Sequence, residues 1–385
     1  MKPQVRHALY SILFCASSLA QKKEHKISFR DSLDHAIDLS DFLINAHGFV
    51  PLISPITEPA VGFGVAVAPI FIEKSKYQMT DESGKPIYSP PTLNAVVGGY
   101  TSNHSQFYGY GRMGNLMKGN LRYKFMAGYG DINMKYFPNE TILKDREIEL
   151  NMKQIPVYLE ATYRIKKSPF YVGGSYLFRK NKVSFVNLDL PFELPPSLDP
   201  KFLDGINSGL GVVLQYDNLD NTLSPTKGTR INTHFNFYGE YLGGDFNYQG
   251  GSAFWMYMHP LGKKWFSSFR VLGQFASKEV PFYYKPFIQL RGTPTKRYQG
   301  LQTIEIETEE RWNLYKRWSL IFFTGMGKAF EDNENTDNTK IVWNAGSGFR
   351  YLIARKFGLQ MGLDVARGPE QFAYYIVFGY SWMRN

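Results

Sequence analysis

The histidines and serines of this chain are the residues that could carry out nucleophilic catalysis. A serine hydrolase needs a serine, a histidine base and a group that orients the histidine, all within hydrogen-bonding distance. His104 adjoins Ser105, but neighbours in sequence do not form such a set, and Gly346-Ser347-Gly348 lacks the spacing of a nucleophile elbow. We therefore expect His104 and His234 to have structural roles and the chain not to be an enzyme. A lipase with its site on a barrel wall is the enzymatic alternative.

Metal, cofactor and nucleic-acid chemistry find little support in the sequence. Cys15 is the only cysteine, so neither a thiolate zinc site nor a disulfide framework is expected in an exported chain. The sequence has no glycine-rich phosphate loop and no cluster of metal ligands. The net charge is +10, but the basic residues are interleaved with acidic ones and do not form the basic stripe of a nucleic-acid binder. We expect no cofactor, no metal and no nucleic-acid partner.

Acidic residues at alternate positions could hold a buried cation. By period-two alternation, one face of a strand carries Glu305, Glu307, Glu309 and Arg311. Asp364 occupies a similar position in a later strand, facing away from its apolar neighbours. Carboxylates placed in this way can bind an arginine in a bidentate manner, and Arg291 lies in the polar stretch 279–300 just before them. The alternative is that Arg291 is solvated, as most charged loop residues are.

Long strands are the elements that would position these residues. Apolar and polar side chains alternate strictly in 119–130, 206–217 and 231–241. The last stretch places on one face Phe372, Tyr374, Ile376, Phe378, Tyr380 and Trp382. Strands of soluble sandwiches average about 5–6 residues, whereas tilted membrane strands need about 9–11 and end in aromatic residues. We therefore predict an all-β fold, a transmembrane antiparallel β-barrel over 59–385, and favour it over a soluble all-β domain. Phe378, Tyr380 and Trp382 would form its C-terminal barrel signal.

The strand count and the connections follow from the same alternation. Period-two matching finds about fifteen segments between residue 59 and the C-terminus. Bacterial single-chain barrels have even strand numbers, so we predict sixteen, with the missing strand in 47–57 or in the polar stretch 73–91. We expect long extracellular inserts at 131–146, 184–203, 279–300 and 331–339, and short periplasmic connections at 166–168, 260–264 and 314–316.

The first twenty residues have the features of a secretory signal peptide. A basic start and a short apolar run precede Ser18-Leu19-Ala20, a small-x-small cleavage site. The run is shorter than the roughly 20 residues that a membrane helix needs. The bulky Phe14 before Cys15 argues against a lipoprotein. We expect export and cleavage near Ala20.

Residues 21–58 would form a short N-terminal segment, either periplasmic or plugging the barrel. Gly48 could end a helix whose apolar face consists of Leu33, Ala36, Ile37, Leu43 and Ile44. A loosely ordered tether is the alternative, because a single helix of this length is marginally stable alone.

Several motifs resemble the Omp85 superfamily, in particular its surface-antigen D15 barrels, which are BamA- and TamA-like. Residues 209–221 followed by 224–228 resemble the strand-and-turn signature of that family. Gln289-Leu290-Arg291-Gly292 is similar to its loop-six motif, with Thr293 in place of the usual aromatic residue. Glu309-Glu310-Arg311 resembles the Glu-x-Arg of the following strand, and Gly362-Leu363-Asp364 the acidic penultimate strand. The resemblance extends over residues 59–385.

The resemblance implies that the 279–300 loop folds into the lumen and is latched there. The latch would consist of Arg291, Gly292, Glu307, Glu309, Arg311 and Asp364.

The sequence departs from the family pattern in two ways. The 38 residues between Ala20 and Pro59 are too few for a POTRA domain, so we expect a POTRA-less subgroup. Gly325 occupies a position that is usually acidic, which predicts a weaker latch.

Two classes of function follow. The first is an Omp85-type barrel in the outer membrane of a Gram-negative bacterium, with a role in outer-membrane assembly or translocation and a weak lateral seam between its first and last strands. Its partners would be outer-membrane lipid and lipopolysaccharide, the barrel assembly machinery for its own insertion, and an unknown client. The alternative is a passive channel or structural barrel, in which anions would be favoured by the inward Arg112, Arg122, Lys124 and Arg350.

Overall fold

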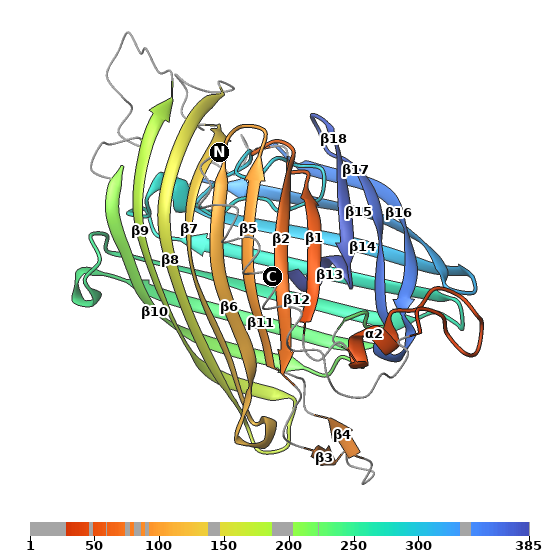
Figure 1. Ribbon diagram of the computed structural model, residues 1–385. Coiled ribbons are helices and arrows are strands. Elements are labelled where there is room, and N and C mark those ends of the chain that lie inside the picture. Colours follow the sequence, from red (N-terminus) through yellow and green to blue (C-terminus); the bar gives the residue numbers. More distant parts are fainter. Residues whose placement is uncertain are drawn as a thin grey trace, which may run out of the picture.

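The computed structural model consists of a 16-stranded antiparallel sheet that curls into a nearly closed barrel (Figure 1). The structure describes residues 28–45, 49–58, 60–73, 78–80, 86–88, 92–137, 147–186, 203–221, 223–331 and 340–384. The predicted all-β barrel of sixteen strands is therefore confirmed. The signal peptide with Cys15 lies outside the described residues, as do most of three inserts. None of the helices in the described part is both long and apolar enough to cross a membrane.

The barrel strands are β1 (Phe49–Ile56), β2 (Gly64–Glu73), β5 (Thr92–Thr101), β6 (Gln106–Leu116), β7 (Leu121–Tyr136), β8 (Ile148–Arg164), β9 (Phe170–Val186), β10 (Asp204–Asp217), β11 (Gly228–Tyr238), β12 (Tyr248–Pro260), β13 (Trp265–Ala276), β14 (Gln302–Tyr315), β15 (Trp318–Phe330), β16 (Val342–Ala354), β17 (Leu359–Arg367) and β18 (Phe372–Phe378). Each pairs with the next along the chain, so the sheet order is the sequence order. This meander is the arrangement that short connections between antiparallel strands allow.

The sixteenth strand is β1, which lies in the first of the two predicted stretches. The barrel accordingly begins at Phe49, ten residues before the predicted boundary at residue 59. Pro51 and Pro55 make this strand difficult to recognise by pattern analysis, because a proline within a run of residues argues against a central strand. The other candidate stretch contains a separate two-stranded sheet of β3 (Gln78–Thr80) and β4 (Pro86–Tyr88).

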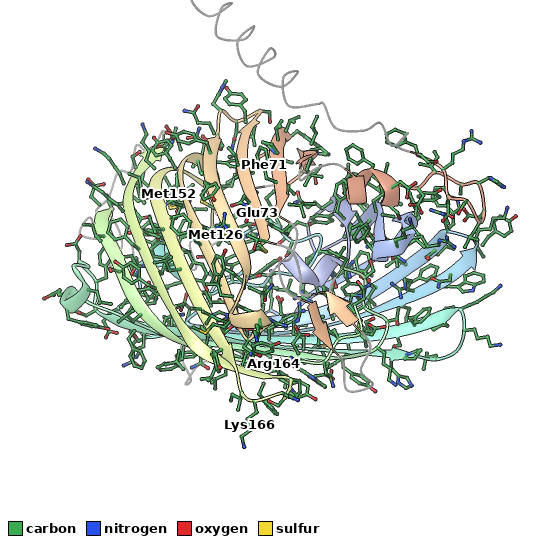
Figure 2. All side chains as sticks on the ribbon, turned by 60° about the horizontal axis from the view of Figure 1, so that its bottom comes forward. Phe71, Glu73, Met126, Met152, Arg164 and Lys166 are labelled. Atoms are coloured by element: carbon green, nitrogen blue, oxygen red, sulfur yellow. The ribbon has the colours of Figure 1, made fainter. Side chains whose placement is uncertain are left out.

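The two rims of the barrel differ in their connections. One rim, here called the terminal end, carries α2 (Ser40–Asn45), the start of β1, the end of β18 and the short turns 165–169, 261–264 and 316–317. The opposite rim, the loop end, carries the long connections 137–147, 187–203, 277–301 and 331–341. The predicted grouping of long and short connections is confirmed, although the 74–91 connection lies on the terminal end. Figure 2 labels Arg164 and Lys166, which lie at the terminal end of β8 and in the turn that follows.

The outward face of the wall is apolar, as a bilayer requires. Leu210, Val212 and Leu214 on β10 are each about half exposed, whereas Val213 between them is fully buried on the inside. A soluble protein would bury such a face, so these side chains fit a wall that contacts lipid.

The last residues of the chain contradict the prediction that Tyr380 and Trp382 continue the outward aromatic face of the last strand. β18 ends at Phe378, and Gly379 at a φ of 72° turns the chain inward. Tyr380 and Trp382 do not continue the outward face but pack in the lumen against Met256 and Met258. Alternation alone predicted the outward position, because aromatic side chains satisfy a lipid face and an apolar interior equally well.

The N-terminal segment differs from both predicted forms. Only 40–45 are helical, and 28–39 form turns closed by a bridge between Arg30 and Ile37. Leu33 and Ile37 are exposed, so the predicted apolar helix face does not form. The segment is nevertheless docked on the terminal end, by charges that are described below.

Candidate functional site: a lumen latch beside the seam

The 277–301 connection folds back into the barrel interior from the loop end. Its 3-10 turn Phe282–Tyr284 packs on the inner side of the wall near Tyr136 and Leu150. Further along the loop, Ile288 and Leu290 are almost fully buried, in a cluster with Val342. The loop is therefore held by apolar packing before it reaches its polar tip, an anchor that the sequence did not predict.

Arg291 at the loop tip lies among three carboxylates of the lumen wall. Its Nε donates to Glu307 at 3.1 Å, and its Nη1 donates to Glu309 at 2.7 Å and to Asp364 at 2.9 Å. The guanidinium carbon lies 3.4 Å from the ring centroid of Phe323. The arginine is thus enclosed by opposite charge and by an aromatic face, both of which stabilise a cation away from water.

Further charged groups extend this network along the wall. Arg270 on β13 lies 3.0 Å from Glu305 and 2.9 Å from Glu307. Arg350 on β16 donates to Asp364 at 2.9 Å. Glu307 and Asp364 therefore each have a second arginine partner, whereas Glu309 accepts a further hydrogen bond from the Ser381 hydroxyl.

The position of Gly325 is filled by a neighbour. A Cβ on Gly325 would lie 2.9 Å from Oδ1 of Asn344 and 3.0 Å from Glu307. Asn344 is paired with Gly325 across the β15–β16 register and donates to Glu307 at 2.9 Å. The amide therefore occupies the space beside the glycine and supplies a polar partner to the latch.

Gly292 fixes the path of the loop tip. Its φ is 88°, and a Cβ would lie 2.8 Å from the backbone nitrogen of Gly368. Both features favour glycine here. The Gly292 N–H donates to the Tyr375 hydroxyl at 2.9 Å, which ties the tip to β18.

The structure brings together most of the predicted latch residues but not all of them. Arg311 lies apart from Arg291, against the Phe266 ring and within 3.4 Å of Gln360. Two further cations of the loop, Lys296 and Arg297, lie outside the cluster and bind to the Tyr283 carbonyl and to Glu370. Sequence reasoning missed several contributors, which are Arg270, Asn344, Tyr375, Ser381 and Trp382. Inward alternation could have identified Arg270, whereas nothing local predicts the inward turn that brings Trp382 to Glu307.

The latch lies beside the seam between the first and last strands. The sheet runs from β1 to β18 without a ladder between these two strands. In the described residues the seam is crossed by the Thr57 hydroxyl, which donates to the Tyr374 carbonyl. Glu58 accepts a hydrogen bond from the backbone N–H of Thr295 in the lumen loop. A cavity of about 310 Å³ lies here, lined by groups that include Glu58, Arg291, Tyr375, Val377 and Trp382.

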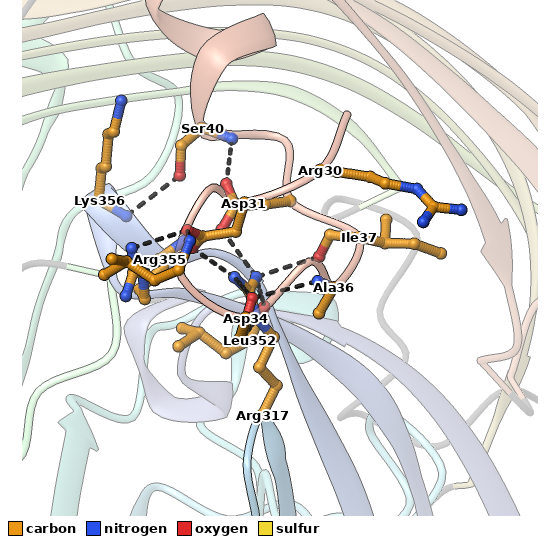
Figure 3. A network of polar contacts seen from close by, with 12 residues as sticks. Arg30, Asp31, Asp34, Ala36, Ile37, Ser40, Arg317, Leu352, Arg355 and Lys356 are labelled. Atoms are coloured by element: carbon orange, nitrogen blue, oxygen red, sulfur yellow. Dashed lines mark hydrogen bonds and ion pairs between the residues drawn. The ribbon is translucent and has the colours of Figure 1, made fainter. Parts of the chain in front are cut away.

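A second charge network docks the N-terminal segment across this seam, and Figure 3 shows it from close by. Arg317, in the turn between β14 and β15, binds Asp31 at 2.5 Å and Asp34 and Asp38 at 2.7 Å. Arg355, in the turn after β16, also binds Asp31 at 2.7 Å. Only three residues separate α2 from β1, so the segment links the start of β1 to turns on the far side of β18.

Two aspartates of this segment, Asp34 and Asp38, have lowered pKa values. Burial alone would raise the pKa of Asp38, but hydrogen bonds from Ser40, from the Arg355 backbone and from Arg317 outweigh it and lower the pKa to about 2. The hydrogen bond from Arg317 lowers the pKa of Asp34, against the smaller effect of burial. Both shifts stabilise the docked segment at neutral pH.

Comparison with known proteins gives the family. The model of the Omp85 superfamily domain matches residues 180–288. The barrel is an Omp85 superfamily barrel. Its predicted resemblance is thereby confirmed, and a barrel of this superfamily places the chain in an outer membrane. A search of curated proteins finds no match.

Solved structures agree with this Omp85 fold. The chain is similar to BamA from Haemophilus ducreyi lacking POTRA domains 1–3, at 13% identity and a TM-score of 0.55, covering 86% of this chain and 70% of that one. It is also similar to CdiB from Escherichia coli, at 10% identity and a TM-score of 0.58, covering 85% and 61%. CdiB from Acinetobacter baumannii is similar at 10% identity and a TM-score of 0.55, covering 86% and 59%. The chain thus spans less than two thirds of the CdiB chains, and at these identities the likeness concerns the fold.

The inward cations of this Omp85 barrel are neutralised by neighbouring acids. Arg112 lies 2.9 Å from Glu73, Arg122 lies 3.2 Å from Asp217 and Lys124 lies 3.2 Å from Glu160. Arg350 is paired with Asp364. Because each expected cation has a carboxylate partner, these residues offer less support for an anion-selective pore than their charge alone suggested.

The two histidines considered for catalysis have other contacts. The Tyr100 hydroxyl lies 2.7 Å from Nδ1 of His104, which adopts a φ of 64° in the β5–β6 turn. Ser105 donates its hydroxyl to Asn103 and not to His104. His234 lies 4.0 Å from Glu160. Among the described residues no group of three or more His, Cys, Asp and Glu could hold a metal ion.

Proposed function

We propose that this Omp85 barrel acts in outer-membrane assembly or translocation, at the seam between β1 and β18. The observation that carries the proposal is the absence of a ladder between these strands in an otherwise continuous sheet. A closed barrel gains hydrogen bonds between every two neighbouring strands. Two neighbouring strands that lack these bonds lower the stability of the barrel, and a purely structural wall has no need of such a gap. The lumen loop and the inward C-terminus lie directly beside this seam, which supports a site of action there.

We further infer how the chain is placed in its surroundings. The signal peptide would direct export of the chain and would be cleaved near Ala20. The terminal end of the barrel would face the periplasm, as short connections do in these barrels. Outer-membrane lipid, lipopolysaccharide and the barrel assembly machinery would be its partners, together with a client not yet identified. We propose no enzymatic activity, because His104 and His234 have the tyrosine and carboxylate contacts described above and no serine hydroxyl is aimed at either in the described residues.

Depletion of the protein is the experiment that tests this role. We expect depletion to lower the amounts of other barrels in the outer membrane, or to change its lipids, before growth is affected. The comparison is quantitative proteomics and lipid analysis of outer membranes from depleted and complemented cells. An outer membrane of unchanged composition, together with loss of a solute uptake activity, would favour the passive channel instead.

A further inference from the structure

The turns at the terminal end carry an excess of positive charge. Apart from the 74–91 connection, each connection there contains at least one lysine or arginine, in 117–120, 165–169, 218–227, 261–264, 316–317 and 355–358. Among the described residues of these turns the only acid is Asp220, which accepts hydrogen bonds from Thr226 and the Lys227 backbone of its own connection. The connections at the loop end are mixed in charge, since their described residues include Glu240, Asp245, Glu279 and Glu331.

The acidic N-terminal segment neutralises only one part of the terminal end. Arg317 and Arg355 bind its aspartates, and Lys356 binds Asp41 at 3.0 Å. The exposed lysines of the other short turns lie along an arc from β6 to β15, here called the basic rim: Lys118, Lys166, Lys167, Lys263, Lys264 and Lys316. In the part of the chain that the structure describes, none of them forms an ion pair with a carboxylate. Figure 2 shows Lys166 projecting away from the wall.

Three lysines of the basic rim adopt a backbone conformation that favours glycine. Lys118, Lys166 and Lys316 have φ values of 58°, 54° and 48°. A side chain in this left-handed region costs backbone energy that glycine avoids. The turn after β16 uses Gly358 at a φ of 65° for the same purpose. The three turns thus keep lysine where turn formation alone favours glycine, which points to a use for the charge.

Each turn of the basic rim also exposes a large apolar side chain close to its lysines. Met117, Ile165, Leu261 and Tyr315 are 61%, 46%, 62% and 64% exposed. At a membrane surface such side chains contact the acyl chains, while the ammonium group of a nearby lysine stays at the polar level. A rim that bound only a soluble acidic protein would not need an exposed apolar group in every turn. The pairing therefore favours a bilayer as the partner of the basic rim.

Aromatic side chains place the basic rim at the level of the lipid headgroups. Phe170, Trp265 and Trp318 are the first residues of β9, β13 and β15, directly after three of these turns. All three side chains are exposed on the wall. Aromatic residues of membrane barrels gather in girdles at the boundary between acyl chains and headgroups. The lysines beside them consequently lie at the depth of the headgroup phosphates.

We propose that the basic rim binds the phosphate groups of anionic phospholipids in the leaflet that surrounds the terminal end. Phosphatidylglycerol is a suitable lipid because its headgroup has a net negative charge, whereas the choline of phosphatidylcholine offsets the charge of the phosphate. Lysine binds phosphate as a point charge on a flexible stem, so the rim gathers several lipid molecules around the wall. The assignment of this leaflet to the periplasmic side rests on the orientation proposed above, but the lipid preference does not.

Quenching of tryptophan fluorescence by brominated lipids tests this preference at the rim itself. The full chain is reconstituted in phosphatidylcholine vesicles that contain increasing fractions of brominated phosphatidylglycerol or of brominated phosphatidylcholine. The quenching that disappears in Trp265→Phe with Trp318→Phe is the contribution of the rim. We expect brominated phosphatidylglycerol to reach half of this quenching at an about fivefold lower mole fraction, which is the effect of about one basic residue near an anionic lipid. The preference should shrink with added salt.

Substitution of one lysine in each turn tests whether the basic rim causes the preference. The preference should fall below about twofold in a variant that combines Lys118→Gln, Lys166→Gln, Lys263→Gln and Lys316→Gln. Arginine at the same four positions should keep it, because the charge is retained. The matched control removes the same charge from exposed lysines near the loop end of β7, β8 and β9, and should keep the full preference: Lys135→Gln, Lys153→Gln, Lys180→Gln and Lys182→Gln. Heat-modifiable migration verifies that each variant is folded.

The outcomes that would overturn the proposal are defined for the unmodified chain as well as for the variants. Equal quenching by the two brominated lipids in the unmodified chain would reject it, and so would an equal loss of preference in the loop-end control. Binding of soluble poly-glutamate to the rim in pure phosphatidylcholine vesicles, without a preference for phosphatidylglycerol, would assign the rim to an acidic protein instead. The depletion experiment is independent, because a lipid preference without a depletion defect would reject only the proposed function.

Discussion

Replacement of Arg291 by alanine is expected to free the tip of the lumen loop while the barrel wall stays folded. The wall is held by interstrand hydrogen bonds and by its lipid-facing side chains, none of which involves Arg291. The tip depends on Arg291 for its contacts to Glu307, Glu309 and Asp364. Removing one side of a buried charge pair typically costs about 3–5 kcal/mol. We expect a value near the lower limit, because Arg270 and Arg350 continue to neutralise Glu307 and Asp364.

Apolar anchors limit the movement that follows. Phe282 and Ile288 remain packed in their clusters, so the loop should loosen around 289–293 and not leave the lumen. Hydrogen–deuterium exchange should rise in that segment, and single-barrel conductance should become larger or noisier. Arg297→Ala is the matched control, since it removes a charge of the same loop that binds Glu370 outside the cluster.

Glu309 is the carboxylate that loses most in this variant, and a double substitution tests this directly. Glu309 loses its hydrogen-bonded arginine partner, so Arg291→Ala combined with Glu309→Gln should recover much of the lost protection. Wild-type exchange and conductance in both Arg291→Ala and Arg291→Lys would mean that no latch exists.

The second large effect is expected from Arg317→Ala, which should release the N-terminal segment from the terminal end. Arg317 is 3% exposed and binds Asp31, Asp34 and Asp38. Its loss leaves Asp34 and Asp38 without their arginine, while Asp31 keeps Arg355. Amide exchange in 28–45 should become at least about tenfold faster, because Arg317 makes more hydrogen bonds to this segment than any other described residue of the barrel. Lys356→Ala is the control, since its exposed pair with Asp41 should contribute little.

The same docking should depend on pH in a defined direction. The lowered pKa of Asp38, about 2, means that its contribution is fully present above the ordinary value near 3.8 and is lost as the pH falls through 2. The groups that face it are Arg317, Arg355, Asp31 and Asp34. The protection factors of the amides in 28–45, that is, their exchange rates relative to an unfolded chain at the same pH, should therefore be constant from neutral pH down to about 5 and fall only in strong acid. A fall in protection near neutral pH would contradict this assignment of the charges.

The parts of the fold that were predictable are those fixed by period-two alternation. Glu307, Glu309 and Asp364 could be placed in the lumen because one register error would put them in lipid. β1 could not be found with the same certainty, because two prolines interrupt its pattern. The inward turn at Gly379 also could not be predicted from the sequence, because the aromatic alternation continues through Tyr380 and Trp382.

The N-terminal dock illustrates a different limit. Asp31, Asp34 and Asp38 look like ordinary solvated acids, and their partner Arg317 is 279 residues or more away in sequence. The residues around an aspartate in the sequence do not reveal whether it will bind an arginine of a distant turn or remain solvated. The helix α2 has only six residues, too few for a helix that is stable alone.

The most direct test of the central claim is to close the seam in living cells. Cysteines at Thr57 and Tyr374, bridged by a short reducible bis-methanethiosulfonate, would join β1 to β18 at their existing contact. The control pair, Val365 and Tyr374, shares one cysteine but joins strands that are already paired. If the seam must part, the bridged Thr57–Tyr374 barrel should fail to restore outer-membrane composition after depletion and should recover with reductant, while the control complements throughout. Full complementation by the bridged seam would contradict the account.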